Sequence, residues 1–301
     1  LVINDSTITT DDTISLFAIA RDQYSNYIEN FSATWTVVNG IGPLNQSSSV
    51  SSVTFNATKP GAGSIKASGE GLISSTGIIK ITNGELAKLT IRDGTNGGGV
   101  EVADISLTTD ENILLYAAGY DADDNYISDV AVNWSSTGNL DQVTAEASSY
   151  TFEPTTAPSS GTIVVQKSGI TSDATGTISV KVGSLNTISI VDAEGSSSAA
   201  IDTLTLTADA DYTFYLAGYD QDQNFIRNIN AQWSIQGNMG SLSTGDSFSS
   251  STKFTASAVG SGAIKADTAS FSDVTGAIKI TNGELAKLTI RDGTNGGGVE
   301  V

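Results

Sequence analysis

The sequence contains no cysteine and no histidine among its 301 residues. Without cysteine the chain forms no disulfide and offers no thiol nucleophile. Without histidine it lacks the side chain that most often serves as a general base and as a metal ligand. No serine lies in the strand-turn-helix setting of a nucleophile elbow either. We therefore expect the chain not to be an enzyme.

Basic residues and long apolar runs are also scarce. The chain has 14 Lys and Arg against 33 Asp and Glu, a formal net charge of -19. Nucleic acids and anionic membranes are bound through Lys and Arg, so neither is expected as a partner. The longest apolar candidate, ILLYAAGY at 113–120, is far shorter than the roughly 18 residues that span a bilayer. The sequence predicts no membrane insertion within this segment.

The start of the sequence and its composition indicate an exported protein. The first residue is Leu1 rather than Met, and no signal peptide follows it. We therefore expect a processed product or a fragment of a longer protein. Ser, Thr and Gly are abundant, whereas proline occurs only four times. This composition is typical of extracellular all-β proteins, so the expected location is extracellular or at the cell surface.

What the sequence does contain is an internal repeat. Trp35, Trp134 and Trp233 follow one another at a spacing of 99 residues. Upstream of each tryptophan lies a matching block: LFAIARDQYSNYI, LYAAGYDADDNYI and FYLAGYDQDQNFI. Each repeat then closes with a similar segment: GIIKITNG, GTISVKVG and GAIKITNG. A fixed period of this kind indicates that one structural unit occurs three times.

Each repeat consists of short alternating runs separated by Gly, Asn, Asp and Ser, with no sustained helical period. Short strands at this spacing predict a β-sandwich. In the run 130–136, Val130, Val132 and Trp134 fall on one face of a strand because strand side chains alternate. The three tryptophans are therefore interpreted as core residues rather than as a platform for sugars.

The segment 119–140, GYDADDNYISDVAVNWSSTGNL, and its two cognates carry a recognisable pattern. A strand ends in Asp, an Asx-rich turn follows, and an apolar stretch leads into V-x-W. The pattern resembles bacterial Ig-like domains of the invasin and intimin type, without the Gly-Asn-Pro turn usual in that family. The resemblance covers all three repeats. It implies Ig-like sandwiches, and it implies a role in repetitive surface adhesins or extracellular fibres.

The repeat spacing places the domain boundaries. We expect an Ig-like domain at 1–84 that lacks its first strand, and complete domains at 85–184 and 185–284. Residues 285–301 would then form the first strand of a further domain. The fold class expected is all-β, with three tandem Ig-like β-sandwich domains and a C-terminal donor or extra strand.

Residues 278–301 repeat residues 79–102 without a difference over 24 positions. Two explanations remain open. The segment either continues a tandem array, or it is a donor strand that completes the first domain of a neighbouring subunit. In both cases its apolar side chains would enter a groove. The residues expected to do so are Leu285, Leu288, Ile290, Val299 and Val301.

The function expected is structural: a subunit of an extracellular filament that assembles head to tail, with the chain itself as partner. The first alternative is the stalk region of a large cell-surface adhesin. A third is an accessory Ig-like or carbohydrate-binding region of a secreted hydrolase. That third reading would require exposed aromatic side chains in a row on one sheet face.

The turns DADDN at 121–125 and DQDQN at 220–224 place oxygens at alternate positions. Calcium loops use such spacing, because the cation takes six or more oxygen ligands. An Asx-rich turn between strands explains the same residues. No cofactor is required by the sequence, and calcium is a possible ligand of these turns. The candidate ligands are Asp121, Asp123, Asn125, Asp220, Asp222 and Asn224.

Two further motifs concern loops. DGTNGGGVE, at 93–101 and 292–300, lacks the G-K-[ST] ending of a phosphate loop and is expected to be a flexible linker between strands. Five N-x-[ST] sequons mark candidate glycosylation sites. They lie at Asn4, Asn30, Asn45, Asn56 and Asn133.

Overall fold

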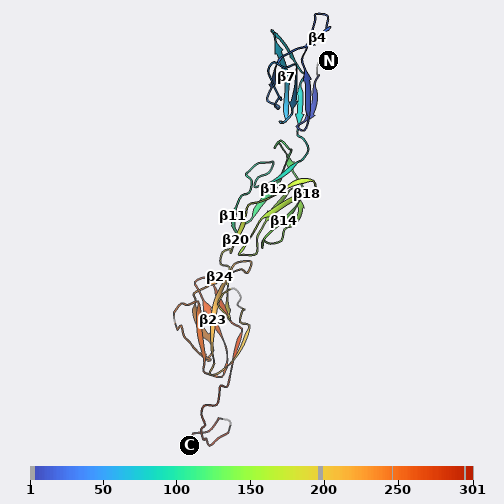
Figure 1. Cartoon of the computed structure of the whole chain (residues 1–301). Coiled ribbons are helices and arrows are strands. Elements are labelled where there is room, and N and C mark those ends of the chain that lie inside the picture. The colour runs from blue at the N-terminus through green and yellow to red at the C-terminus, as the bar shows by residue number, and fades with distance from the viewer. Residues whose placement is uncertain (1–3, 196–198, 246, 295, 301) are drawn as a thin grey trace. The chain divides into compact units, whose positions relative to one another are not determined.

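The computed structural model describes residues 4–195, 199–245, 247–294 and 296–300. In these residues the chain forms strands and no helix (Figure 1). A search of the same residues for a long apolar helix that could cross a bilayer gives none. The expectation of an all-β chain of Ig-like sandwiches is confirmed.

The chain divides into two compact units. The first contains residues 1–107, 111–154 and 158–180, and so holds the first two repeats. The second contains residues 181–301 together with the short segments 108–110 and 155–157.

The third repeat shows the sandwich most completely, as two five-stranded sheets. One sheet contains β21 (Thr187–Val191), β23 (Asp211–Tyr219), β24 (Phe225–Asn228), β26 (Gly240–Leu242) and β27 (Ser251–Ala256). The other contains β22 (Thr203–Thr207), β25 (Gln232–Gln236), β28 (Gly260–Asp267), β29 (Ser272–Val274) and β30 (Ala277–Thr281). The opening segment is shared between the sheets, because β21 is antiparallel to β23 whereas β22 is parallel to β30.

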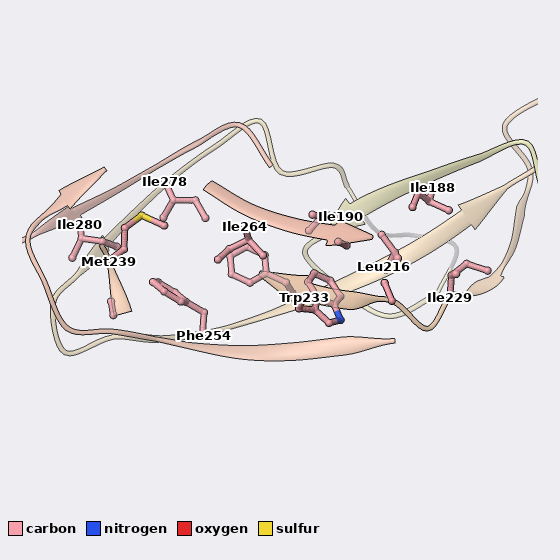
Figure 2. Packing of buried hydrophobic residues seen from close by; sticks show 14 residues of the cluster. Ile188, Ile190, Leu216, Ile229, Trp233, Met239, Phe254, Ile264, Ile278 and Ile280 are labelled. Atoms are coloured by element: carbon pink, nitrogen blue, oxygen red, sulfur yellow. The ribbon is translucent and has the colours of Figure 1, made fainter. Parts of the chain in front are cut away.

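The inner faces of these two sheets form one apolar core (Figure 2). Strand β27 alternates buried and exposed side chains, as expected for a strand with one face inside. Ile188 and Ile190 bring the opening strand β21 into this core, where Leu216 and Trp233 are also buried. The opening strand is thus a structural part of the sandwich rather than a linker.

The second repeat has an eight-stranded and a three-stranded sheet. The larger contains β10 (Lys88–Arg92), β12 (Ile113–Tyr120), β13 (Tyr126–Asp129), β14 (Val132–Ser136), β15 (Thr144–Ala147), β16 (Ser149–Phe152), β18 (Ile163–Lys167) and β19 (Ile170–Ala174). The smaller contains β11 (Ile105–Thr108), β17 (Ser159–Gly161) and β20 (Ile178–Lys181). Its opening strand β10 pairs with β12 along its length and touches β19 at one position.

The first repeat differs at its opening strand. Its five-stranded sheet contains β1 (Ser6–Thr9), β5 (Thr34–Val38), β7 (Gly61–Gly69), β8 (Leu72–Ser75) and β9 (Ile79–Thr82). Two pairs complete it, namely β2 (Thr13–Phe17) with β6 (Ser52–Asn56), and β3 (Ile19–Arg21) with β4 (Tyr27–Asn30). Strand β1 is parallel to β9, as β22 is to β30. Among the described residues no strand takes the place that β10 and β21 fill in the other repeats.

Candidate assembly site

The opening strand of the second repeat shows how residues 285–291 could be used, because 86–92 have the same sequence. Lys88 pairs with Tyr120 and Arg92 with Tyr116, in antiparallel register. Strand alternation turns Leu89 and Ile91 inward. They are 4% and 0% exposed. The sequence of this segment therefore forms a half-buried strand when a matching groove is present.

Three carboxylates of the second repeat bind this strand and the loop after it through hydrogen bonds and an ion pair. Asp173 accepts a hydrogen bond from the backbone N–H of Ile91 at 2.6 Å. Asp129 accepts one from the Thr95 hydroxyl and one from the backbone N–H of Asn96, both at 2.9 Å. The third carboxylate, Asp124, forms an ion pair with Lys88.

The pKa shifts follow from these contacts. Burial alone would raise the pKa of Asp129, but hydrogen bonds from Asn96, Thr95 and Tyr126 outweigh it, so the pKa lies below its ordinary value. The hydrogen bond to Asp124 raises the pKa of Lys88 despite partial desolvation. The Lys88 ammonium also lies 5.7 Å from the ring centroid of Tyr120, within cation–π range. The groove thus favours a cation at this position.

The third repeat uses the same strand position with different side chains. Strand β21 pairs Thr187 with Tyr219, and Ile190 is 1% exposed. Asp273 accepts the backbone N–H of Ile190 at 2.6 Å, as Asp173 does for Ile91. No cation is present at the Thr187 position, so this strand is neutral where the second repeat has Lys88.

The corresponding surface of the first repeat is apolar and open. Ile19 is 42% exposed, whereas Ala118 and Ala217 at the same place are fully buried. Phe17, two residues earlier in the chain, is 67% exposed. The side chains of Leu72 and other apolar residues of β4 and β8 are also exposed. We use the name first-repeat groove for strands β3, β4 and β8, which correspond to β12, β13 and β19 around β10 in the second repeat.

Residues 285–290 belong to no strand in the structure. Leu288 and Ile290 are 88% and 79% exposed, in contrast to Leu89 and Ile91 of the identical segment. Leu285 and Val299 are exposed as well, and Val301 lies outside the described residues. Leu288 and Ile290 are therefore exposed where their counterparts Leu89 and Ile91 are buried. Leu86, the counterpart of Leu285, is half-buried, and Val299 is exposed in both copies because its counterpart Val100 is 64% exposed.

The loop after this segment keeps its conformation in both copies. Val299 donates its N–H to Asp292 Oδ1 at 2.7 Å, and Asp292 donates to the Val299 carbonyl at 3.3 Å. Asp93 and Val100 make the same two bonds. The backbones of Arg291 and Glu300 form an isolated antiparallel β-bridge, as those of Arg92 and Glu101 do. The glycine-rich segment is therefore a hydrogen-bonded turn, formed without a sandwich around it.

The turn at Asp121, a candidate calcium ligand, is filled by hydrogen-bond donors. Asp121 is fully buried. Its Oδ1 accepts the N–H groups of Asp123 at 3.1 Å and Asn125 at 2.8 Å. Its Oδ2 accepts the hydroxyl of Thr10, from the end of β1, at 2.7 Å. Burial alone would raise the pKa of Asp121, but hydrogen bonds from Thr10, Asn125 and Gly84 lower it below its ordinary value.

Asp220 repeats this arrangement in the second compact unit. Thr109 donates its hydroxyl to Asp220 Oδ2 at 2.8 Å, and Gly183 donates its N–H to the same oxygen at 3.0 Å. The pKa of Asp220 is lowered because these bonds and those from Asn224 outweigh the effect of burial. Asp123 and Asp222 are exposed. Within the described ranges no three acidic side chains gather around one point that could hold a metal. Calcium binding at these turns stays a prediction.

The remaining candidates are placed as follows. The tryptophans are buried, and each indole N–H donates to a backbone carbonyl at 2.9 Å. These are Trp35, Trp134 and Trp233. All five sequon asparagines are exposed. They are Asn4, Asn30, Asn45, Asn56 and Asn133.

Sequence reasoning missed the acceptors that hold the opening strand. Asp129, Asp173 and Asp273 sit in stretches that look like ordinary polar strand ends. Thr10 and Thr109 were missed because a threonine in a Thr-rich strand carries no signal of its own. The available signal was the repeat: Thr10 and Thr109 lie 99 residues apart, as Asp121 and Asp220 do.

Comparison with known proteins adds no family. No protein-family model and no curated protein matches the sequence. Among solved structures, the S-layer protein rSbsC(31-844) is 16% identical with a TM-score of 0.27, over 90% of this chain and 38% of that one. The I9-I11 tandem from titin is 10% identical with a TM-score of 0.29, over 94% of this chain and 98% of that one. Protocadherin Gamma B2 extracellular cadherin domains 3-6 are 12% identical with a TM-score of 0.35, over 94% of this chain and 72% of that one. The fold assignment rests on the sheets themselves.

Proposed function

We propose that the chain is a structural segment of an extracellular filament or surface array built from tandem Ig-like sandwiches. Residues 285–300 are the opening strand and loop of a further sandwich in that array. One observation carries this proposal. Leu89 and Ile91 are buried in the second repeat, whereas Leu288 and Ile290 of the identical segment are exposed.

The energetics of such a use depend on how much ordering the segment still requires. Burying Leu285, Leu288 and Ile290 would contribute about 1.5–3 kcal/mol each. Ordering an extended segment opposes this by about 1–2 kcal/mol for each residue fixed. Asp292 and Val299 already make the two hydrogen bonds that Asp93 and Val100 make in the second repeat, which reduces the ordering cost. Ladder hydrogen bonds to the accepting sandwich add to the gain.

Two kinds of array fit this proposal. In one, the segment enters a sandwich of a separate copy, which is strand addition to a sheet edge. Such contacts are head to tail and give open filaments when the rotation does not close a ring. In the other, the accepting sandwich belongs to the same polypeptide. A stalk of a surface adhesin would use the second kind of array. In both, the partner is a further copy of an Ig-like repeat.

The surroundings are inferred from composition. A net charge of -19 favours the solubility of an exported array. Such an array would contain no disulfides, because the chain has no cysteine. An acidic surface also limits unspecific association between neighbouring arrays. Ig-like sandwiches with a completed opening strand leave fewer exposed sheet edges, which otherwise invite aggregation.

The experiment that tests the proposal combines denaturing gel electrophoresis with negative-stain images of the same native material. Filaments that dissolve into a band near 30.9 kDa would show separate copies joined by exchanged strands. A band many times larger would show one continuous polypeptide array. Native material that contains only monomers of 30.9 kDa, with residues 285–300 still open to protease, would contradict the proposal.

A further inference from the structure

The three repeats can be compared groove by groove, because the strand pairings fix which residues correspond. Arg21 pairs with Tyr27 as Tyr120 pairs with Tyr126. Ser25 and Asp124 occupy the same turn, with φ of 68° and 67°. Two more correspondences follow when the register of β3 with β4 is matched to that of β12 with β13, and the register of β7 with β8 to that of β18 with β19. They are Asn30 with Asp129, and Ser74 with Asp173.

All three carboxylates that hold the opening strand of the second repeat are missing from the first-repeat groove. Ser25 stands where Asp124 pairs with Lys88. Asn30 stands where Asp129 accepts the loop donors, and Ser74 where Asp173 accepts the Ile91 N–H. A guanidinium, Arg21, replaces the Tyr120 ring that lies below the Lys88 ammonium.

Residues 285–291 would meet this changed surface if they entered the first-repeat groove. In the register of β10 with β12, Lys287 would lie opposite Arg21. Like charges directly opposite each other in a ladder are destabilising. The N–H of Ile290 would face Ser74, whose neutral hydroxyl accepts a weaker hydrogen bond than a carboxylate. At these two positions the first repeat therefore has a like charge and a neutral hydroxyl, where the second repeat has a ring and a carboxylate.

The third repeat shows that strand and groove vary together. Its opening strand has Thr187 in place of Lys88. Its groove has Gln223 where the second repeat has Asp124, and Asn228 where it has Asp129. At the positions of Lys88, Asp124 and Asp129 the third repeat therefore has neutral side chains, whereas the second repeat has a cation and two carboxylates. The carboxylate of Asp173 is kept in the third repeat as Asp273.

We propose that residues 285–291 are specific for a groove of the second-repeat type, one that carries carboxylates at the Asp124, Asp129 and Asp173 positions. The first-repeat groove takes a different opening strand, one with a neutral side chain opposite Arg21, as Thr187 is in the third repeat. This inference rests on the proposed function and decides which sandwich can follow residue 284 in the array. The occupant is in each case the opening strand of an Ig-like repeat.

The test grafts the second-repeat groove onto the first repeat of the whole 301-residue chain. The grafted variant combines Arg21→Tyr, Ser25→Asp, Asn30→Asp and Ser74→Asp. All four positions are exposed, so the core is untouched. Self-association of the grafted and unchanged chains is followed by sedimentation velocity. We expect the graft to associate at least about tenfold more tightly than the unchanged chain.

A matched variant shows that the association uses the segment. Adding Leu288→Asp and Ile290→Asp to the grafted chain should return it to the monomer, because charged side chains cannot enter the groove without a large desolvation cost. In the unchanged chain, Lys287→Thr alone should strengthen association, since it removes the cation opposite Arg21.

The outcomes separate the two proposals. If the unchanged chain associates through Leu288 and Ile290 as tightly as the graft, the specificity is overturned while the strand role stands. If neither the graft nor the Lys287→Thr chain associates at all, both the specificity and the strand role are overturned. Circular dichroism and the melting temperature of each variant verify that the sandwiches remain folded.

Discussion

Corresponding aspartates of the first and second repeats lie in the same kind of turn but in different environments. Asp121 and Asp22 both accept backbone N–H groups of their own turn, at 2.8 Å from Asn125 and Asn26 respectively. Asp121 is fully buried and also accepts the hydroxyl of Thr10. Asp22 is exposed, and its bonds come from its own turn. The pair therefore separates the contribution of the turn from that of the added donors.

Substitution of the two aspartates by asparagine should have unequal effects. In Asp121→Asn an amide –NH₂ replaces one acceptor oxygen, so the donors from Thr10, Gly84 and the turn compete for the remaining one. Leaving a buried donor without its acceptor costs about 1–3 kcal/mol. Asp22→Asn, the matched control, should stay within about 0.5 kcal/mol because the site is exposed. Urea unfolding of the two variants measures this; equal losses would contradict the assignment.

The pH dependence of stability follows from the same carboxylates. The pKa values of Asp121, Asp129 and Asp220 are lowered in the folded chain. The unfolded state therefore binds more protons than the folded state in the acid range. Their contribution is fully present above the unfolded pKa, about 3.9, and is lost as the pH falls through the lowered folded pKa. We expect melting temperatures to fall below about pH 4.

Between about pH 5 and 8 the melting temperature should be nearly constant, because histidine and cysteine, which titrate there, are absent. Differential scanning calorimetry across the range from pH 2 to pH 8 tests both halves of the expectation. A marked loss of stability between pH 7 and pH 5 would contradict it, since no lowered carboxylate titrates in that interval.

At the scale of the element, one strand sequence provides its own control. Ile91→Ala removes a side chain that is 0% exposed and opens a cavity, so it should destabilise the second repeat by about 2–5 kcal/mol. Ile290→Ala changes the identical sequence context where the side chain is 79% exposed, so the cost in the monomer should be within about 0.5 kcal/mol. Thermal unfolding of the monomeric variants gives both values. Similar losses would show that residues 285–291 are already packed in a sandwich.

The opening strand also shows what could be predicted from sequence. Alternation and the 99-residue spacing predict strands and inward tryptophans because both depend on local pattern and burial. The sequence of the Asp121 turn allows both an Asx turn and calcium ligation. The donor that Asp121 binds in this structure, the hydroxyl of Thr10, is 111 residues away. Asp173 is invisible from sequence for the same reason, since it holds a strand 82 residues away. Long-range pairing decides such contacts, and no local pattern encodes it.

At the scale of the whole molecule, the segment 285–291 should be the most accessible strand-forming sequence in the described chain. Proteases require a locally opened backbone of several residues. Lys88 and Arg92 lie in a strand paired along its length to β12, whereas Lys287 lies in a stretch without strand pairing. To open β10 for cleavage, Leu89 and Ile91 must leave the core, whereas Leu288 and Ile290 are already exposed.

Trypsin should therefore cut after Lys287 and Arg291 well before it cuts after Lys88 and Arg92, although the surrounding sequences are identical. Intact-mass measurement distinguishes the sites, since cleavage at the first pair removes the last 14 or 10 residues and cleavage at the second pair divides the chain near residue 90. Protection of Lys287 should appear when the segment enters a groove, as in native filaments or the associated grafted chain. Protection in the monomer, or continued cutting in the assembled state, would contradict the strand role. Cleavage rates in the two states thus measure how far assembly, rather than sequence, determines the structure of this segment.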